Sequence, residues 1–324
     1  MDFFTHLLIG LLLSTGPAVY PAAVWIYGTF MAIFPDADVF LFPLWKKHPA
    51  LRHHGISHSL AFVLIAGPVG AVPLHFLYEG GWAAFALAGT LGGLSHVVAD
   101  YLTSYSVPLW APYSWKGWAA NLELPVNPYT ILTSSLALVA LIALWSSGIA
   151  SGLFPAVLWV TGAAFLGYLG VRALLRRSIA RGIPGFARGV HALEPTATPF
   201  TWYLRTRREV RGTVVTRYEK VSRSSARAGG QVFYDLDRFP ESPSGPVECP
   251  EDALLHTAHA AEPLLGGRWS PDFLAATLET EGDGYAVFWF LWWRIFRSPT
   301  PGILARVNRA GEVSVTEARR SLSW

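Results

Sequence analysis

The stretch Trp82–Leu102, WAAFALAGTLGGLSHVVADYL, carries no charged residue before Asp100. About twenty apolar residues are what an α-helix needs to cross the ~30 Å hydrocarbon core of a bilayer, so we predict a membrane-spanning helix here. His96 and Asp100 are four positions apart and therefore share one face of that helix. An ionised carboxylate at the end of such a span is unfavourable unless it is paired or coordinated. We infer that its partner is a divalent metal ion held with other histidines and aspartates.

The two halves of the 324-residue chain differ in charge. Residues 1–171 contain 4 Lys or Arg and 6 Asp or Glu, which leaves 25 − 4 = 21 basic and 22 − 6 = 16 acidic residues for 172–324. We therefore predict a membrane domain over 1–176, a Gly- and Pro-rich linker over 177–199 and a soluble domain over 200–324. The basic excess of the second half, 21 − 16 = +5, is too small and scattered to indicate a nucleic-acid partner.

The first half is expected to be an all-α polytopic membrane domain with about four to six transmembrane helices, in contact with the lipid bilayer. Stretches 60–78, 82–102, 130–147 and 153–174 are each long enough to cross. Two shorter helices, 3–15 and 19–34, would tilt or insert only partly. The turns near 79–81 and 148–152 contain only Glu79, whereas the other side carries the basic residues Lys46, Lys47, Arg52, Arg172, Arg176, Arg177 and Arg181. By the positive-inside tendency, we predict a multi-pass protein of the inner (plasma) membrane whose basic loops and C-terminal domain are cytoplasmic.

The second half is predicted to be a small, mostly β domain. Residues 201–221 alternate polar and β-prone residues, which indicates strands or a hairpin. A short amphipathic helix is expected over 251–265 and a closing hairpin over 302–318. The aromatic run 285–296 is too short to cross a bilayer, so we predict a buried strand or an interfacial segment. His256 and His259 lack a companion acid motif, and we predict that they lie at the surface.

Four polar motifs interrupt the apolar half: Thr5-His6, Pro35–Asp38, His53–Ser59 and Ser95–Asp100. With six crossings, all four reach the same, cytoplasmic, face. Imidazole and carboxylate groups without thiolates suit Zn²⁺, with Mn²⁺ or Fe as alternatives, and their number leaves room for one or two ions. Each motif alone is weak evidence, because a single His commonly bonds to backbone and an Asp after Pro commonly caps a helix. The metal ligands predicted from their convergence are His6, Asp36, Asp38, His53, His58, His96 and Asp100.

These motifs resemble those of the bacterial membrane-bound metal-dependent hydrolase family (YbcI/YdjM/YfhP-like), over Met1–Leu132. The family pattern runs Thr-His, Pro-Asp-x-Asp, His-Arg-Gly-x-Thr-His-Ser and His-x-x-x-Asp, followed by Pro-x-Ser, which is Pro112-Tyr113-Ser114 here. The YfhP-like branch looks closest, because it also has a C-terminal soluble part that residues 199–320 loosely resemble. The resemblance implies an integral membrane protein with metal-dependent hydrolase activity. A more distant likeness to helical zinc-dependent phospholipases C rests mainly on His-x-x-x-Asp and is an analogy only.

Two positions depart from the family pattern. His54 stands where the family usually has Arg, which removes a fixed cation that could hold a phosphate or carboxylate. Asn127 stands where related sequences often have Asp, which removes a ligand or base. We predict catalytic roles for Asp38, His54 and Asp100, because a carboxylate left off the metal is a candidate general base and His54 is either a ligand or a donor beside one. Glu123 could approach the site from the loop after 82–102.

We therefore expect an enzyme, a membrane-bound hydrolase of an ester or phosphoester that uses metal-activated water. Its substrate is an unknown small molecule or a lipid, since the site opens at headgroup level. Two alternatives stay open: a membrane protein that binds or transports metal ions, and a regulatory scaffold in which the site is a structural staple. Transport requires polar groups at the opposite membrane level, where the spans offer only His75.

Overall fold

The computed structural model describes residues 1–14, 21–44, 49–51, 53–78, 81–146, 153–187, 189–223, 232–237, 240, 245–265, 274–291 and 300–322. Lys46, Lys47, Arg52, Glu79 and the turn 148–152, on which the predicted orientation depends, lie outside these residues, as does 292–296 of the aromatic run. The chain divides into two compact units. The first comprises Met1–Leu174 and Pro195–Pro199, and the second comprises Leu175–Glu194 and Phe200–Trp324.

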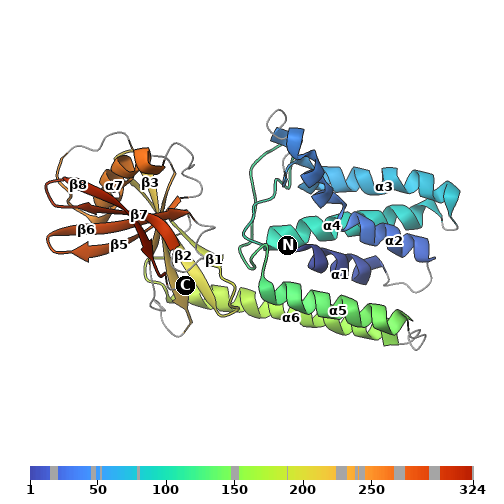
Figure 1. The fold of residues 1–324 in the computed structure, drawn as a ribbon. Helices are drawn as coiled ribbons and strands as arrows, with labels where there is room; N and C mark the ends of the chain where they lie inside the picture. The colour runs from blue at the N-terminus through green and yellow to red at the C-terminus, as the bar shows by residue number, and fades with distance from the viewer. Residues whose placement is uncertain are drawn as a thin grey trace. The chain divides into compact units, whose positions relative to one another are not determined.

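Helices build the first unit, as predicted (Figure 1). The α-helices are α1 (Phe3–Ser14), α2 (Ala22–Met31), α3 (Leu60–Leu77), α4 (Trp82–Leu102), α5 (Pro128–Ser146) and α6 (Leu153–Gly182), whose last residues belong to the second unit. Three short 3₁₀ helices lie between α2 and α3: η1 (Phe34–Leu44), η2 (Pro49–Leu51) and η3 (Ile56–His58). The 3₁₀ helices were not predicted from the sequence. They carry two of the four polar motifs.

Three helices in the described part of the chain are long and apolar enough to cross a membrane: Leu60–Leu77, Trp82–Leu102 and Ala156–Gly182. The apolar helices Phe3–Leu13, Ala22–Met31 and Pro128–Leu144 are shorter. A helical N-terminal half with candidate spans is therefore confirmed. The count of four to six crossings stays a prediction.

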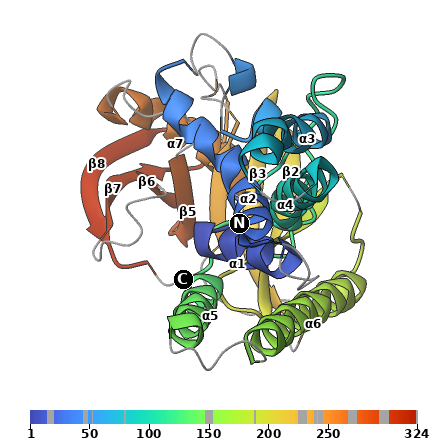
Figure 2. The ribbon, with the colours of Figure 1, turned by 90° about the vertical axis from the view of Figure 1, so that its right-hand side faces the viewer.

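Helix α4 is the central helix of the first unit and packs against α1, α2 and α3. Figure 2 looks roughly along these helices. Glycines permit the close approach, as is usual where membrane helices meet. A Cβ at Gly92 would lie 2.0 Å from the carbonyl oxygen of Gly28 in α2, and one at Gly67 in α3 would lie 2.6 Å from the backbone nitrogen of Thr90. The glycines of the 82–102 stretch are therefore packing requirements of the fold.

The second unit contains an antiparallel eight-stranded sheet in the order β1 to β8. Its strands are β1 (His191–Pro195), β2 (Thr201–Val210), β3 (Thr213–Ser222), β4 (Phe233–Leu236), β5 (Leu274–Glu281), β6 (Gly284–Leu291), β7 (Thr300–Val307) and β8 (Val313–Arg320). The strands or hairpin predicted over 201–221 and the hairpin predicted over 302–318 are confirmed as the hairpins β2–β3 and β7–β8. In the first, Val210 pairs with Thr213 across the two-residue turn Arg211-Gly212, both of which have positive φ as a type I′ hairpin requires. The segment predicted as a linker, 177–199, holds the end of α6 and strand β1.

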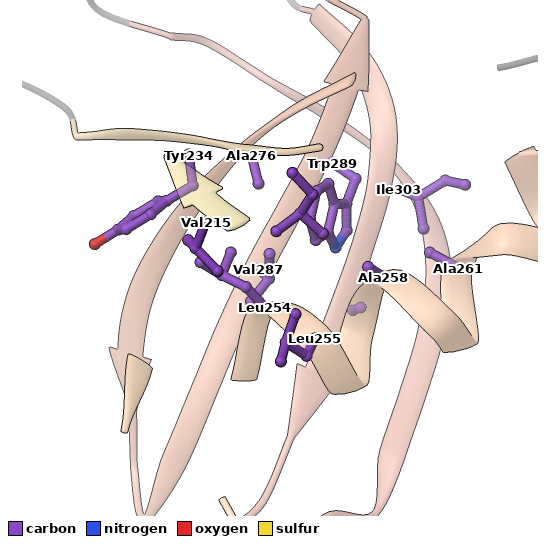
Figure 3. Close-up of a cluster of buried hydrophobic side chains, with 12 residues drawn as sticks. Val215, Tyr234, Leu254, Leu255, Ala258, Ala261, Ala276, Val287, Trp289 and Ile303 are labelled. Carbon is purple, nitrogen blue, oxygen red and sulfur yellow. The ribbon is translucent and has the colours of Figure 1, made fainter. Parts of the chain in front are cut away.

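Helix α7 (Pro250–Leu265), which was also predicted, covers part of this sheet. Leu254, Leu255 and Ala258 of α7 pack against Val287 and Trp289 of β6 (Figure 3). The alternate residues of β6, Ala286, Phe288 and Phe290, are buried in a separate cluster on the opposite face of the strand. Burial of both faces explains why this run is continuously apolar, since a half-buried strand would alternate. His256 was predicted to lie at the surface, and this was wrong: it is buried beside the turn at Gly311.

We predict that Gly92→Leu lowers the stability of the membrane unit by about 1–3 kcal/mol, because the added side chain meets backbone that cannot rotate away. Thermal unfolding followed by circular dichroism in detergent would measure this change. The matched control is Gly170→Ala in α6, where an added Cβ meets nothing within 4 Å. Equal Tm values for the two variants would contradict the close packing of α2 on α4.

Candidate metal centre

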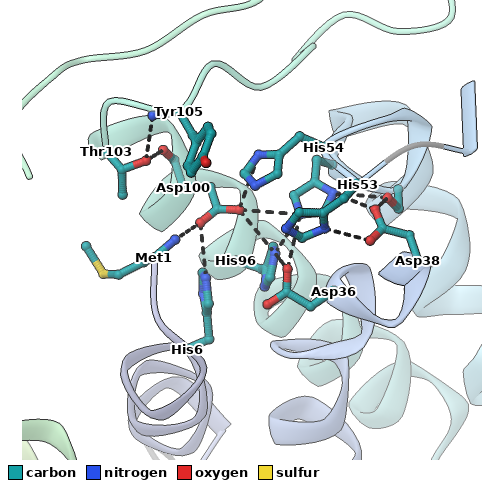
Figure 4. A network of polar contacts seen from close by, with 12 residues as sticks. Met1, His6, Asp36, Asp38, His53, His54, His96, Asp100, Thr103 and Tyr105 are labelled. Carbon is teal, nitrogen blue, oxygen red and sulfur yellow. Dashed lines mark hydrogen bonds and ion pairs between the residues drawn. The ribbon is translucent and has the colours of Figure 1, made fainter. Parts of the chain in front are cut away.

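Four side chains from distant parts of the sequence converge at one end of α4 (Figure 4). Asp36 comes from η1, His58 from η3, and His96 and Asp100 from the last turns of α4. One ligand atom from each lies within 4.8 Å of the others. His58, His96 and Asp100 are almost fully buried, whereas Asp36 keeps 28% of its side chain exposed. Asp36 is thus the most accessible of the four side chains.

The distances between these atoms match those of a tetrahedral metal site. His58 Nε2 lies 3.1 Å from His96 Nε2, 3.4 Å from Asp36 Oδ1 and 3.4 Å from Asp100 Oδ2. His96 Nε2 lies 3.5 Å from Asp36 Oδ1 and 3.4 Å from Asp100 Oδ2. Four nitrogen or oxygen ligands at the usual 2.0–2.1 Å from Zn²⁺ form a tetrahedron with edges of about 3.3–3.4 Å. The donor set and its spacing therefore fit such an ion.

Hydrogen bonds on the far side of each imidazole turn its Nε2 atom into the cluster. Helix α2 ends at Met31, so the Ala32 carbonyl lacks a helical partner and accepts a bond of 2.8 Å from His96 Nδ1. His58 Nδ1 lies 3.0 Å from Ser57 Oγ and 3.3 Å from Asp38 Oδ2. Because both Nδ1 atoms carry protons, two Nε2 lone pairs face each other at 3.1 Å. Only a cation, a proton or a metal ion, relieves that repulsion.

The remaining predicted residues surround this group. His6 Nε2 lies 3.1 Å from Asp100 Oδ1, to which the Met1 amino group is also bonded, and its ring stacks on His96 at 3.9 Å. His53 Nδ1 lies 2.7 Å from Asp38 Oδ1, while Ser57 Oγ donates to Asp38 Oδ2 at 2.6 Å. Thus all four motifs meet. Asp38 contacts His53 and His58. It contributes no atom to the four-atom group, by which we mean the close-set ligand atoms of Asp36, His58, His96 and Asp100.

His54 differs from the other imidazoles of the cluster in its backbone conformation, and it shares with His6 a buried Nδ1 atom that has no hydrogen-bond partner among the described residues. The φ of His54, 59°, is uncommon for a residue other than glycine. The Nδ1 atom of His54 lies 4.0 Å from Asp100 Oδ2, and the ring lies between His58 and Tyr105. His53, His54 and His58 form a second group whose nitrogen atoms are close enough to hold a cation.

The electrostatics of the cluster favour a positive charge. Burial alone would lower the pKa of His58, but hydrogen bonds with Asp100, Asp36 and Asp38 raise it to about 10. Burial alone would raise the pKa of Asp36, yet hydrogen bonds with His58 and His96 hold it below its ordinary range. For His54, burial and the neighbouring His58 charge lower the pKa to about 4, so this imidazole is neutral at pH 7. The cluster therefore holds a proton strongly, and a divalent ion would displace it.

The comparison with known families agrees with these motifs. Residues 1–174 match the family model described as YdjM inner membrane protein. The chain belongs to the YdjM inner membrane protein family. This match does not single out the YfhP-like branch. No curated protein and no solved structure matches the chain. Family membership confirms the inner-membrane prediction, while the cytoplasmic placement of the site stays a prediction.

Glu123 and Asn127 of this YdjM-family chain belong to a separate buried network. Asn127 Nδ2 donates to Glu123 Oε1 at 2.6 Å, and Asn127 Oδ1 caps α5 by accepting from the backbone nitrogen of Tyr129 at 2.9 Å. Tyr168 donates to Glu123 Oε2, and Arg172 Nε lies 3.5 Å from the same oxygen. Arg172, which the sequence analysis counted among the basic residues of the cytoplasmic side, is therefore a buried ion-pair partner. Asn127 has a structural role here.

A cavity of about 610 Å³ lies between α1, α4, α5 and α6. Leu91, Leu94 and Val98 contribute from α4, on the face that points largely away from His96 and Asp100. Its hydroxyl groups already bond within the helices, as Ser134 Oγ does to the Thr130 carbonyl at 2.6 Å. This hydrocarbon-lined space is therefore distinct from the polar cluster.

The sequence identified the His and Asp residues of the cluster but not the groups that hold or contact their imidazole rings. The Ala32 carbonyl carries no side-chain signal, and its role follows only from where α2 ends. Tyr105 belongs to no motif. Ser57 lies inside the His53–Ser59 motif, where the family pattern has Thr, and this hydroxyl position could have been identified as the support of His58.

We predict that His96→Ala and Asp100→Ala each abolish stoichiometric metal binding, because each removes one atom of the four-atom group. Elemental analysis of the detergent-purified protein after equilibration with Zn²⁺ or Mn²⁺ would measure the loss. The matched control is His75→Ala, which changes a histidine of α3 outside the cluster and should retain the ion. Monodisperse elution of all three variants shows that they are folded. Unchanged metal content in both cluster variants would remove the site.

We predict that Asn127→Asp destabilises the protein by about 1–3 kcal/mol, because a buried amide donor is replaced by a second carboxylate facing Glu123. Thermal unfolding would show a lower Tm. The double variant Glu123→Gln/Asn127→Asp restores a donor–acceptor pair and should recover part of the loss. A neutral single substitution would show that the Asp found in relatives fits this network equally well.

Proposed function

We propose that this protein is a metal-dependent hydrolase of an ester or phosphoester. The observation that carries the proposal is the pair of imidazoles whose Nε2 atoms face each other at 3.1 Å between two carboxylates. Asp36, His58, His96 and Asp100 would hold the ion. When bound, Zn²⁺, or Mn²⁺ or Fe, supplies Lewis acidity and an activated water molecule.

The residues around this group have distinguishable roles. Asp38 is engaged at both oxygens by His53, Ser57 and His58, so it orients His58 and is unsuited to accept a further proton. His6 holds the Asp100 oxygen that faces away from the four-atom group. Both act as positioning residues, which conserve ligand geometry through hydrogen bonds.

His54 is the candidate general base. It is neutral at pH 7, and its Nδ1 has no hydrogen-bond partner among the described residues. This atom lies 4.0 Å from Asp100 Oδ2, and the His54 side chain is 14% exposed. A neutral imidazole there can take the proton that leaves a water molecule attacking the substrate. The Arg that relatives carry at this position would instead bind an anionic group of the substrate. This protein would therefore use the position for proton transfer, and its relatives would use it for substrate binding.

The membrane placement is part of the proposal. Arg176, Arg177 and Arg181 follow the apolar part of α6, which supports a cytoplasmic C-terminal domain by the positive-inside tendency. The cluster lies at the same end of α4 from which the chain proceeds to α5. A multi-pass arrangement with the site on the cytoplasmic side accounts for both features.

We expect the metal-loaded protein in nanodiscs to hydrolyse members of a panel containing p-nitrophenyl phosphate, bis(p-nitrophenyl) phosphate and p-nitrophenyl acetate, and a chelator to stop the reaction. His54→Ala should lower kcat by about 10²–10⁴-fold, the usual contribution of a general base, with metal content unchanged. His259→Ala, on α7 of the second unit, is the matched control and should keep full activity. Full metal loading without turnover would instead favour the scaffold alternative, and metal uptake into vesicles would favour transport.

A further inference from the structure

Exposed aromatic side chains are frequent on the connection between α4 and α5, which begins just after Asp100. Together with an exposed residue of η1 they form what we call the interfacial rim: Phe40, Tyr105, Trp110, Tyr113, Trp115 and Trp118. Tyr113 is 91% exposed and Phe40 is 83% exposed. So many large apolar groups facing water would be unfavourable, and in soluble proteins such patches mark contact surfaces.

The backbone of the rim is held in place, so the outward direction of these rings is a property of the fold. Val107 and Trp118 exchange backbone hydrogen bonds of 2.9 Å. The carbonyl of Leu109 accepts a 3.0 Å bond from the backbone nitrogen of Leu60, at the start of α3. The connection is therefore fastened to the helix that follows the His58 motif.

Part of the rim lies beside the cluster. The Tyr105 ring lies 5.1 Å from the ring of His54. Phe40 follows Asp38 by two positions in η1, the element that supplies the exposed Asp36. The rim therefore contacts His54 through Tyr105 and shares η1 with Asp36.

The composition and spacing of the exposed aromatics match a membrane interface. Trp and Tyr concentrate where hydrocarbon meets headgroups, because their rings are apolar and their N–H or O–H groups are polar. A second exposed pair, Tyr78 and Trp82, lies at the other end of α4. The 21 residues of α4, which lies between the two groups in the sequence, span about 31 Å, close to the ~30 Å thickness of the hydrocarbon core. Lys116, whose Nζ lies 4.8 Å from the Trp118 ring, adds a cation suited to anionic headgroups.

We propose that the interfacial rim lies in the lipid headgroup layer, so that the metal centre receives the headgroup of a glycerophospholipid from the bilayer. This inference rests on the proposed hydrolase function and specifies its substrate class. The bond broken is an ester or phosphoester of that lipid: water adds across it, one product takes the hydroxyl group, and the leaving oxygen takes the proton. No co-reactant other than water is required.

The depth of the rim can be measured without any activity. Cys249 is the single cysteine, so Cys249→Ser followed by Tyr113→Cys gives one attachment point for a nitroxide spin label. In phosphatidylglycerol–phosphatidylethanolamine nanodiscs, collision with O₂ and with a water-soluble nickel chelate reports depth. Matched labels come from Val69→Cys on the exposed face of α3 and Ala310→Cys on the β7–β8 turn. We expect nickel access at Tyr113 several-fold below that at Ala310 and several-fold above that at Val69. Equal access at Tyr113 and Ala310 would overturn the placement.

The substrate class is tested by two probes on the metal-loaded, full-length protein. We expect phospholipid in phosphatidylglycerol–phosphatidylethanolamine vesicles to be hydrolysed at least tenfold faster than bis(p-nitrophenyl) phosphate in solution. Faster turnover of the soluble diester, with the vesicle lipid intact, would overturn the lipid inference and leave the hydrolase proposal standing. Turnover of neither probe by fully loaded protein would overturn the lipid substrate, whatever depth the label reports. The hydrolase proposal would fall with it only where p-nitrophenyl phosphate and p-nitrophenyl acetate are not hydrolysed either.

Discussion

The buried carboxylate of Asp100 is the constraint on which the first unit depends. One oxygen faces His58 and His96, and the other faces His6 and the Met1 amino group, so α1, η3 and α4 all meet at this residue. A buried ionised carboxylate stripped of partners costs several kcal/mol, and removing one partner of a buried pair is strongly destabilising. The approach of α1 and η3 to the end of α4 is therefore coupled to the charge state of the cluster, and a bound cation would stabilise the helical packing as well as any reaction.

The packing of α2 on α4 and the orientation of His96 depend on each other, because the residues involved lie one helical turn apart. Gly92 contacts Gly28 where α4 meets α2, and one turn further along the same two helices His96 Nδ1 reaches the Ala32 carbonyl at 2.8 Å. The hydrogen bond that turns His96 toward the cluster is possible only because no side chain separates the two backbones a turn earlier. Glycines that look like ordinary membrane-helix residues thus set the direction of a candidate metal ligand.

The sequence predicted the helices of the first unit well because long apolar runs have few other solutions, and Trp82–Leu102 was located to the residue. The convergence of the four motifs followed from counting crossings. The sequence could not show which oxygens and nitrogens come together, because that depends on η1 and η3, short elements without periodicity. Strands β1 and β4 were missed for a related reason, because their 5 and 4 residues are too few to show an alternation of polar and apolar residues. Strand β5 was missed because its first three residues are all apolar, whereas the long hairpins show a clear alternation. Asn127 was compared with Asp in relatives, yet its hydrogen bond to Glu123 explains the amide without reference to metal binding.

A structural metal site, called a staple above, and a catalytic metal site differ in the surroundings that they require. A staple is best closed on all sides, with every polar atom engaged, whereas a catalytic centre keeps one accessible position. Here Asp36 remains 28% exposed. His54 has a left-handed backbone conformation, and its Nδ1, which has no hydrogen-bond partner in the part of the chain that the structure describes, lies 4.0 Å from Asp100 Oδ2. Such conformations cost of order 1–3 kcal/mol and persist where the surroundings enforce them, which is most often at functional sites. A residue that only closed off a staple would gain nothing from that cost, so the arrangement at His54 favours chemistry at the cluster.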